Sequence, residues 1–528
     1  MFSGCLLPAA AAAVAASVAV VAAAVRTNMA ARRTPSVGVV SDEGLSCLLE
    51  VTPPQDDPLW QTAGQSLLMC GPLGYFVSLL WAHGAKVDLF TPGVLRRLAA
   101  SAAIAILNTL LSAADWAAHR SGVAATPLCE QPVFVVGIPR SGTTLLHSLL
   151  AADPRLLAPD TFQGAHPTSF LFARCARQRY LGASLSTTRP MDNVAQSWDL
   201  LLTSCPPAYV CVWVAVVSYF AVIVSPAPVE DEVGVAVLAG GVSYYSAMFF
   251  IKHSREFLPY LTWDTPAAIA AFPRWRDAFL LFCRRVLYAS RMAEKASREG
   301  EGSMPPRPDR QLVLKSPSHT AHIRVLRDLF PRAKFVFIHR HPEEVARSSV
   351  ALAQRFLPIN GLAGFTAADA ETWILDMDRC LSRAYLRDRH SIPAGSLVEV
   401  SYADLAADPM GTLHTIYERL GLDGRAELRT THARVAQEAL AYQAEGKCGR
   451  HAPLSPAACA LLYDAWREYY DAFGYTPTHA SSAATEATAA VGPMVGGAGA
   501  PATPTAKGQA AFADTARTTG LPVTPVAS

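Results

Sequence analysis

The sequence predicts an α/β fold, in which a P-loop-type parallel sheet is flanked by helices, apolar helices precede it and a disordered tail follows it. Short, mostly apolar runs at 133–136, 312–314 and 334–338 are typical of buried parallel strands. A segment with helix signals follows each run. Strands that alternate with helices in this way build a parallel sheet.

The first run leads into a glycine-rich loop at 137–144, and the leucines after this loop repeat with helical spacing. Strand, glycine loop and helix form the P-loop layout. A helix that begins near Gly142 leaves backbone N–H groups unpaired and directs its positive end into the loop, which suits a phosphate. The predicted anion-binding residues of this loop are Gly137, Arg140, Ser141, Gly142, Thr143 and Thr144.

The loop lacks the lysine of nucleotide-hydrolysing P-loops, because Thr143 stands at that position. Thr144 keeps the hydroxyl group, and Arg140 is the cation that can fork onto a 5'-phosphate or a neighbouring sulfonate. A kinase or NTPase would also need an acid after another strand to hold magnesium, whereas the second strand ends in Lys315. An ordinary P-loop kinase is therefore the disfavoured alternative.

Charged residues follow the second and third strands. Lys315 lies where the second strand ends, the edge at which open α/β sheets bind ligands. After the third strand, Pro342 suits the first turn of a helix, with Arg340 just before it and Ser348 about two turns inside. Arg340 and Ser348 would then converge on an anion. An ion pair between Arg340 and one of the two glutamates after Pro342 is the alternative.

These blocks resemble the PAPS-dependent sulfotransferases, which use 3'-phosphoadenosine 5'-phosphosulfate as donor. Lys315 and His319 match that family's Leu-Lys-Ser-Pro-x-His block, and Arg340 and Ser348 have its separation of eight residues. The resemblance covers about residues 98–475. It is also carried by Thr161-Phe162-Gln163, Arg189-Pro190-Met191-Asp192-Asn193-Val194, Glu230-Asp231-Glu232 and the block from Tyr402 to Pro409, which indicate the branch with an Arg-Pro-Met-Asp-Asn-Val signature.

The resemblance implies that the glycine loop grips the 5'-phosphosulfate and that Arg340 and Ser348 grip the 3'-phosphate. It implies transfer of a sulfuryl group to a hydroxyl group without a metal ion. A basic loop that closes over the 3'-phosphate would come from Lys447 and Arg450. A catalytically inactive scaffold that binds the desulfated product PAP is a second alternative, and it predicts loss of these contacting residues.

In-line attack on sulfur needs a deprotonated acceptor and a stabilised leaving phosphate. Arg140 and Lys315 are placed to offset charge on the bridging oxygen. Candidate bases for the acceptor hydroxyl are the acids at 230–232, Asp192 and His166, with Glu232 favoured over Asp192. Three adjacent acids also suit a solvated face, so a purely structural role stays open.

Two further residues of the matching blocks have expected roles. Gln163 cannot act as a base, and we interpret it as an amide that positions the acceptor. His319 is either a donor to the leaving group or a helix-capping histidine.

The amino-acid composition limits the kinds of binding partner that the protein is expected to have. With 45 basic and 43 acidic residues, the net charge of +2 argues against a nucleic-acid footprint. The 11 cysteines lack metal-site spacing, and a bridge between Cys205 and Cys211 is less favoured than free thiols. Residues 476–528 are rich in Ala, Thr, Pro and Gly, and we expect them to form a disordered tail after a sulfotransferase domain at 128–475.

The chain before this domain is strongly apolar. Residues 1–41 form an apolar leader, which suits a transit peptide or a signal anchor. Residues 42–127 are expected to be helical, with uncharged stretches at 58–85 and 98–114 that suit buried or membrane-lying helices. We therefore expect a membrane-associated enzyme of the Golgi and secretory pathway or of a plastid. Its acceptor would be a hydroxylated small molecule, lipid, sterol or glycan.

Residues 200–229 carry no charge and separate Asp199 from the acids at 230–232. A membrane-spanning helix here would put the glycine loop and Arg340 on opposite sides of a membrane, which would destroy a single donor site. An inserted apolar hairpin or loop, or a stretch from an imperfect gene model, is therefore the expectation.

Overall fold

The computed structural model describes residues 71–89, 92–172, 228–301, 310–422 and 454–478. Several sequence predictions fall outside these ranges: the leader at 1–41, Asp192, the pair Cys205 and Cys211, the apolar insert up to residue 227, Lys447 and Arg450, and the tail after residue 478.

A five-stranded parallel sheet forms the centre of the fold, with the order β2-β3-β1-β4-β5. This sheet confirms the predicted α/β class. β1 lies in the middle, between β3 and β4, so the three predicted strands are direct neighbours. The strands are β1 Val133–Val136, β2 Leu156–Leu157, β3 Gln311–Lys315, β4 Lys334–His339 and β5 Leu397–Ser401.

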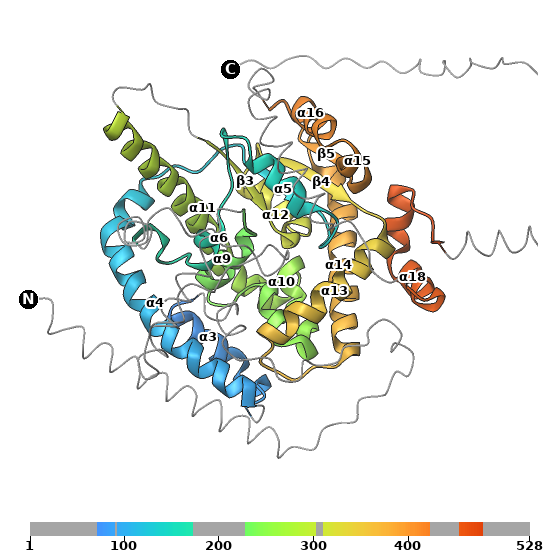
Figure 1. Cartoon of the computed structure of the whole chain (residues 1–528), viewed down its shortest axis with the longest axis horizontal. Helices are drawn as coiled ribbons and strands as arrows, with labels where there is room; N and C mark the ends of the chain where they lie inside the picture. Colours follow the sequence, from blue (N-terminus) through green and yellow to red (C-terminus); the bar gives the residue numbers. More distant parts are fainter. Residues whose placement is uncertain (1–70, 90–91, 173–227, 302–309, 423–453, 479–528) are drawn as a thin grey trace, which may run out of the picture. The chain divides into compact units, whose positions relative to one another are not determined.

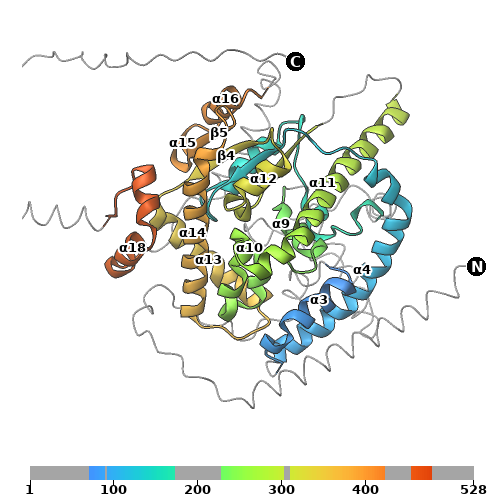
Figure 2. The same ribbon diagram turned by 180° about the vertical axis from the view of Figure 1, so that it is seen from behind.

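Helices surround the sheet in both views of the molecule (Figures 1 and 2). The helices are α3 Leu73–His83, α4 Pro92–Ala124, α5 Thr143–Ala151, α6 Thr161–Ala165, α9 Asp231–Leu238, α10 Pro259–Thr262, α11 Pro266–Glu301, α12 Ile323–Leu329, α13 Pro342–Asn360, α14 Ala367–Asp388, α15 Tyr402–Ala407, α16 Pro409–Leu420 and α18 Pro456–Phe473. Short 3-10 helices are η2 Gly84–Lys86, η4 Tyr244–Phe249, η5 Ile251–Phe257, η6 Pro317–Thr320 and η7 Arg389–Ser391.

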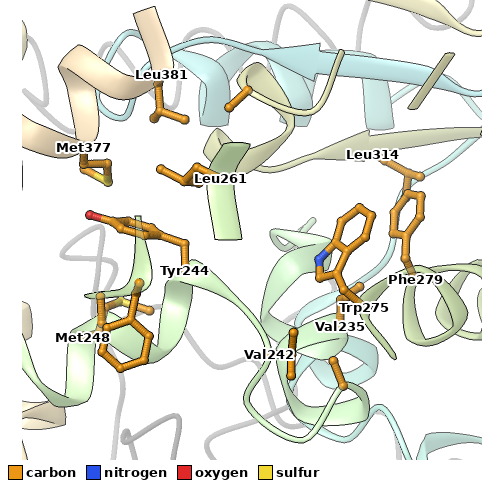
Figure 3. Packing of buried hydrophobic residues seen from close by; sticks show 14 of the residues in the cluster. Val235, Val242, Tyr244, Met248, Leu261, Trp275, Phe279, Leu314, Met377 and Leu381 are labelled. Carbon is orange, nitrogen blue, oxygen red and sulfur yellow. The ribbon is translucent and has the colours of Figure 1, made fainter. Parts of the chain in front are cut away.

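The two faces of the sheet bury two separate apolar cores, because successive strand residues point to opposite faces. Val133 and Val135 pack with leucines of α5 and with α15 and α16. Phe134 and Val136 pack on the other face, in a larger core that includes residues of α11, α13, α14 and α18. Figure 3 shows part of this larger core. The residues labelled there include Val235, Trp275, Phe279 and Leu314.

Local sequence explains where the helices next to the sheet begin. Pro342 occupies the first turn of α13, where a missing N–H costs nothing, and Glu343 and Glu344 favour the positive helix end. α6 begins with a capping box, in which Asp160 and Gln163 bond each other's backbone N–H groups. These starts fix the residues just before the helices, which include Arg340.

α4 extends further than its apolar stretch at 98–114 and is the one helix in the described ranges that is long and apolar enough to cross a membrane. The qualifying part is Arg97–Ala124, with a hydropathy of 1.5. α3 packs beside α4, and α11 packs against it as well. In the described residues, the stretch at 58–85 contains α3, and the stretch at 98–114 lies within α4.

Candidate functional site

The glycine loop connects β1 to α5 and needs its glycines for close packing. Gly142 precedes α5 with a φ of 105°, and a Cβ atom there would lie 2.4 Å from the ring of Tyr402. At Gly137, a Cβ atom would lie 2.6 Å from the carbonyl oxygen of Ile338 in β4. Gly142, the N-cap residue of α5, has no side chain that could cap the first N–H groups of the helix, and unpaired N–H groups at a helix start are what an anion site requires.

The neighbouring chain segments hold this loop in place. Thr320, at the end of η6, accepts a hydrogen bond from the Gly137 N–H at 2.9 Å and donates one to the Gly137 carbonyl at 3.0 Å. Ser141 donates its hydroxyl proton to the Ile138 carbonyl at 2.8 Å and is fully buried. Arg140 has a φ of 65°, an uncommon conformation for a residue with a side chain. These hydrogen bonds hold the loop in one conformation, in which the backbone of Arg140 is left-handed.

The two predicted anion-binding segments meet at Arg140. Its Nε atom donates to Ser348 Oγ at 2.9 Å, although the residues lie 208 positions apart. Arg340 Nη1 approaches the Arg140 carbonyl oxygen at 3.4 Å. The strand order explains this meeting, because β1 and β4 are adjacent and parallel, and both end at the same edge of the sheet.

Arg340 makes the predicted ion pair as well as facing the loop. Its Nε atom lies 2.7 Å from Glu344 Oε2, and its guanidinium lies 4.2 Å from the ring centre of Tyr402. Its backbone N–H donates to Tyr469 Oη at 3.3 Å. Glu343 bonds Thr478 instead. The aromatic face and Glu344 thus orient a guanidinium whose side chain is 14% exposed.

Lys315 lies at the end of β3 with its ammonium group directed at the loop. Its Nζ atom is 3.4 Å from Thr144 Oγ1 and 2.7 Å from Glu230 Oε1. Tyr245 donates its hydroxyl proton to the second carboxylate oxygen of Glu230, and the same hydroxyl lies 3.3 Å from Ser316 Oγ. The Glu230 side chain is 28% exposed, whereas Lys315 is 3% exposed. An acid, a cation and a phenol therefore adjoin the glycine loop.

The three adjacent acids at 230–232 contact three different parts of the protein, so they do not form the solvated face that was one alternative. Asp231 and Glu232 are buried within the first turn of α9, whereas Glu230 precedes the helix. Successive helical residues are about 100° apart around the axis, so neighbours diverge. Asp231 Oδ2 contacts His319 Nε2 at 2.6 Å. Glu230, and not the favoured Glu232, makes the contact with Lys315.

Glu232 accepts hydrogen bonds from Ser243 Oγ at 2.5 Å and from Trp275 Nε1 at 3.0 Å. Burial raises its pKa to about 7, against the opposing effect of the charge on His319. The Glu232 side chain is 1% exposed. Of its two hydrogen-bond partners, Ser243 is the N-cap residue of η4 and Trp275 lies in α11. Glu232 is thus enclosed by protein in this structure.

His319 is fully buried, with the rings of Phe134 and Phe279 edge-on at 5.5 Å and 5.6 Å. Burial lowers its pKa, but the carboxylate of Asp231 outweighs burial, so the pKa of His319 is raised. Ser316, and not His319, caps η6. The observed partner of His319 is therefore a buried acid.

Two other sequence candidates lie in the α6 region. The side-chain oxygen of Gln163 accepts from the Asp160 N–H at 2.9 Å, so it completes the capping box of α6. His166 is buried against the ring of Phe162, and burial lowers the pKa of His166 to about 3. Its imidazole is therefore neutral at physiological pH.

Sequence reasoning missed Thr320, Tyr245 and the role of the Tyr402 ring. Tyr402 opens a block that already carried the family resemblance, so its position was a usable signal. Thr320 directly follows the matched Lys315–His319 block. Tyr245 lies in no motif, and only the fold brings it to Glu230. Within the described residues, no group of three or more His, Cys, Asp or Glu side chains is arranged to hold a metal ion.

The central strand, its glycine loop and the cations at the ends of both neighbouring strands form a P-loop-type arrangement that lacks the usual lysine. The chain belongs to the sulfotransferase family, whose model matches residues 132–427. It is a transferase of sulfur-containing groups. This membership confirms the resemblance found in the sequence.

Two relatives are the omega-hydroxy-beta-dihydromenaquinone-9 sulfotransferases Stf3 of Mycobacterium bovis and Mycobacterium tuberculosis. Each is 28% identical over 357 residues, which cover 67% of this chain and 77% of the relative. Solved structures that resemble the chain include sulfotransferase STF1 from Mycobacterium tuberculosis and STF9 from Mycobacterium avium. The first has a TM-score of 0.43 and 17% identity, over 75% of this chain and 99% of the other; the second has 0.49 and 19%, over 81% and 98%.

Proposed function

We propose that this sulfotransferase moves a sulfuryl group from PAPS to a hydroxyl group of a lipid acceptor. The observation that carries the proposal is the contact between Arg140 and Ser348, which joins the glycine loop to the second anion-binding segment. One loop suits the 5'-phosphosulfate, and the other, with Arg340, suits the 3'-phosphate. The short distance between the segments fits a single ligand that carries both groups.

The residues around the loops fit such a donor. The glycine cradle has no room for side chains, and the N–H groups at the start of α5 face it. Arg140, Lys315 and Arg340 supply three cations, each of which contacts a polar group of the protein in this structure: Ser348, Glu230 and Glu344. We propose that donor oxygens replace part of these contacts on binding.

We propose Glu230, in place of Glu232, as the base that takes the acceptor proton. Glu230 is the acid beside Lys315 and the loop, and its side chain remains partly exposed. When Lys315 turns to the donor, Glu230 keeps its bond from Tyr245. The acceptor oxygen then bonds to sulfur, its proton moves to Glu230, and the bond between sulfur and the bridging oxygen breaks. Arg140 and Lys315 stabilise the charge left on the phosphate of PAP.

The proposed class of acceptor is based on the two mycobacterial relatives, whose names specify a hydroxylated menaquinone derivative. Such a molecule carries a hydroxyl group on a long apolar chain. A lipid of this type fits the apolar character of α4, and we propose that the enzyme works at a membrane. These relatives are bacterial, and they give no support to the Golgi or plastid location.

Transfer of label tests the proposal directly. Purified full-chain enzyme with sulfur-labelled PAPS should label a hydroxylated isoprenoid quinol dispersed in detergent, and Arg140→Ala should abolish most of that label. Phosphorus-labelled ATP with magnesium should give none. Labelling from ATP alone would favour the kinase alternative. PAP binding without transfer to any quinol, sterol, glycolipid or soluble hydroxyl compound would favour the inactive scaffold.

A further inference from the structure

Three polar residues of α4 are buried on one side of the helix. Ser101, Asn108 and Asp115 are spaced seven residues apart and are each no more than 1% exposed. At about 100° per residue, the three positions fall within an arc of about 40° on the helix. Helices at the surface of a protein in water show the opposite pattern, with polar residues facing out.

Two of these three buried residues, Asn108 and Asp115, bond to other parts of the protein. Asn108 donates to the Gly71 carbonyl at 3.0 Å. Asp115 pairs with Arg285 of α11 at 2.8 Å and accepts from the Phe172 N–H at 3.0 Å. These bonds fix the rotation of α4 about its axis, so the opposite face of the helix must point away from the protein.

From Leu95 to Ala118, the exposed residues described on the opposite face are apolar. Between Leu95 and Ala118, six of the eight residues described as exposed fall within an arc of about 80°, opposite the polar arc. Every exposed residue that the structure describes between Leu95 and Ala118 is Ala, Leu or Trp. We name the outer α4 face by its six members, Leu95, Ala99, Ala103, Leu110, Ala113 and Ala117.

Two tryptophans extend this apolar surface. Trp116 of α4 is 60% exposed, and the guanidinium of Arg120 lies 4.2 Å from its ring centre. Trp81, at the end of the neighbouring α3, is 78% exposed. Exposed tryptophan beside a cation is typical of the boundary between hydrocarbon and lipid headgroups, where the ring is apolar and the charge reaches water.

We propose that the outer α4 face docks into the surface of a lipid bilayer, with α4 held on the protein by its polar face. A hydrocarbon environment explains why the polarity of the helix is reversed, since it favours apolar side chains outside and bonded polar groups inside. The bonds to α11 and to Phe172 make α4 part of the folded domain. The helix therefore lies on the membrane and does not cross it.

The docking of α4 on a bilayer extends the proposed function and rests on it, because it would bring the enzyme to a lipid acceptor. Ser112 of α4 donates to Thr168 Oγ1 at 2.6 Å, in the segment that follows α6. α6 starts after Asp160, which pairs with Pro228 in an isolated bridge, two residues before Glu230. A continuous set of bonded segments thus links the membrane-facing helix to the proposed base. A lipid acceptor could present its hydroxyl group to Glu230 without leaving the bilayer.

Vesicles of phosphatidylcholine with brominated acyl chains test the surface in the full-chain protein, because bromine quenches nearby tryptophan. We expect quenching in the wild type, and loss of at least half of the quenched signal in the Trp81→Phe, Trp116→Phe double variant. The control variant Trp466→Phe removes an indole of α18 that is only 2% exposed, and it should leave the quenched signal unchanged. Leu110→Asp should lower vesicle partitioning by about tenfold or more. Leu461→Asp, at a similarly exposed site on α18, should leave vesicle partitioning unchanged.

Three results would overturn this surface. Equal quenching in the double variant would place the membrane contact elsewhere on the chain. A wild type that ignores vesicles but forms dimers, which Leu110→Asp dissociates, would make the face an interface between copies. Vesicle binding that appears only after removal of residues 1–70 would mean that this segment covers the face. PAP binding, measured on the same samples, reports separately on the proposed function and on correct folding of each variant.

Discussion

Arg140 and Ser348 are joined by a hydrogen bond of 2.9 Å between Nε and Oγ, across 208 positions of the chain. The bond connects the glycine loop after β1 to the helix after β4. Since Arg340 Nη1 also approaches the Arg140 carbonyl, the two segments proposed to bind anions lie side by side. We propose that one adenosine ligand with two phosphate-like groups binds across both segments.

Arg340→Ala should weaken binding of PAP. Loss of a hydrogen bond to a charged group costs roughly 1.5 to 3 kcal/mol, or about 10- to 150-fold in Kd. Isothermal titration with PAP measures the effect. Glu344→Gln removes the partner that competes for the guanidinium, so it should not weaken PAP binding. Arg332→Ala, at an exposed pair with Glu130, is the neutral control. Equal affinity for PAP in Arg340→Ala and wild type would refute the assigned role.

Gly142→Ala should damage both stability and donor binding. The backbone φ of 105° is unfavourable for alanine, and the added Cβ would lie 2.4 Å from the Tyr402 ring. We expect a loss of roughly 1 to 3 kcal/mol in the free energy of unfolding, measured by urea denaturation. Gly474→Ala also places alanine at positive φ but meets no atom within 4 Å, so it should cost less and leave PAP binding intact. Identical losses in the two variants would mean that crowding at Tyr402 is unimportant.

Glu230→Gln should lower kcat by about 10²- to 10⁴-fold, because the amide cannot take the acceptor proton. PAP affinity should change little or improve, since Lys315 loses a competing partner. Glu232→Gln, in the enclosed site beside Trp275, should reduce kcat far less. Single-turnover transfer from labelled PAPS gives the comparison. The reverse order of effects would return the role of base to Glu232.

Tyr245→Phe should move the acidic limb of the pH–kcat profile to higher pH. The phenol donates to Glu230, and a donor to a carboxylate stabilises its charged form. Removal of the donor therefore takes away stabilisation of the charged carboxylate and reduces the fraction of active base at low pH. A profile of unchanged shape, with kcat uniformly lower, would indicate that Tyr245 acts only in packing.

Folding stability should fall as pH rises through the range set by Glu232. Burial raises its pKa from 4.5 to about 7, so the folded protein retains a proton that the unfolded chain has lost. Stability from this group is full below pH 4.5 and declines toward pH 7, by about 2 kcal/mol between pH 4.5 and 6.5. Glu232→Gln should remove this slope in urea titrations. His319, with a pKa raised above 6.5, adds a decline of the same sign at higher pH. A persistent slope between pH 4.5 and 6.5 in the variant would contradict the assignment.

The sequence was sufficient to predict the central strands and the cations at their ends. β1, β3 and β4 are apolar runs next to glycine, lysine and arginine signals, so their place and their common edge followed from pattern alone. β2 spans only Leu156–Leu157 and is too short to show a periodicity. Its pairing with β3 depends on the folded neighbours.

The neighbours of Lys315 were beyond sequence reasoning. Which of three adjacent acids faces Lys315 depends on the residue at which α9 begins, and the pattern at 230–232 does not fix that residue. Tyr245 reaches Glu230 from η4, far from any motif. The pairing of Arg340 with Glu344 was foreseen as one of two alternatives, because both glutamates lie within one turn of the helix start.

Thermal unfolding of the wild type with PAP, compared with ATP and magnesium, tests the central claim most directly. A ligand at 100 times its Kd stabilises the folded state by about 2.7 kcal/mol. We predict a clear rise in Tm with PAP, a smaller rise or none with ATP and magnesium, and no rise with PAP in the Arg140→Ala, Arg340→Ala double variant. Stabilisation of the wild type by ATP with magnesium and not by PAP would contradict the account.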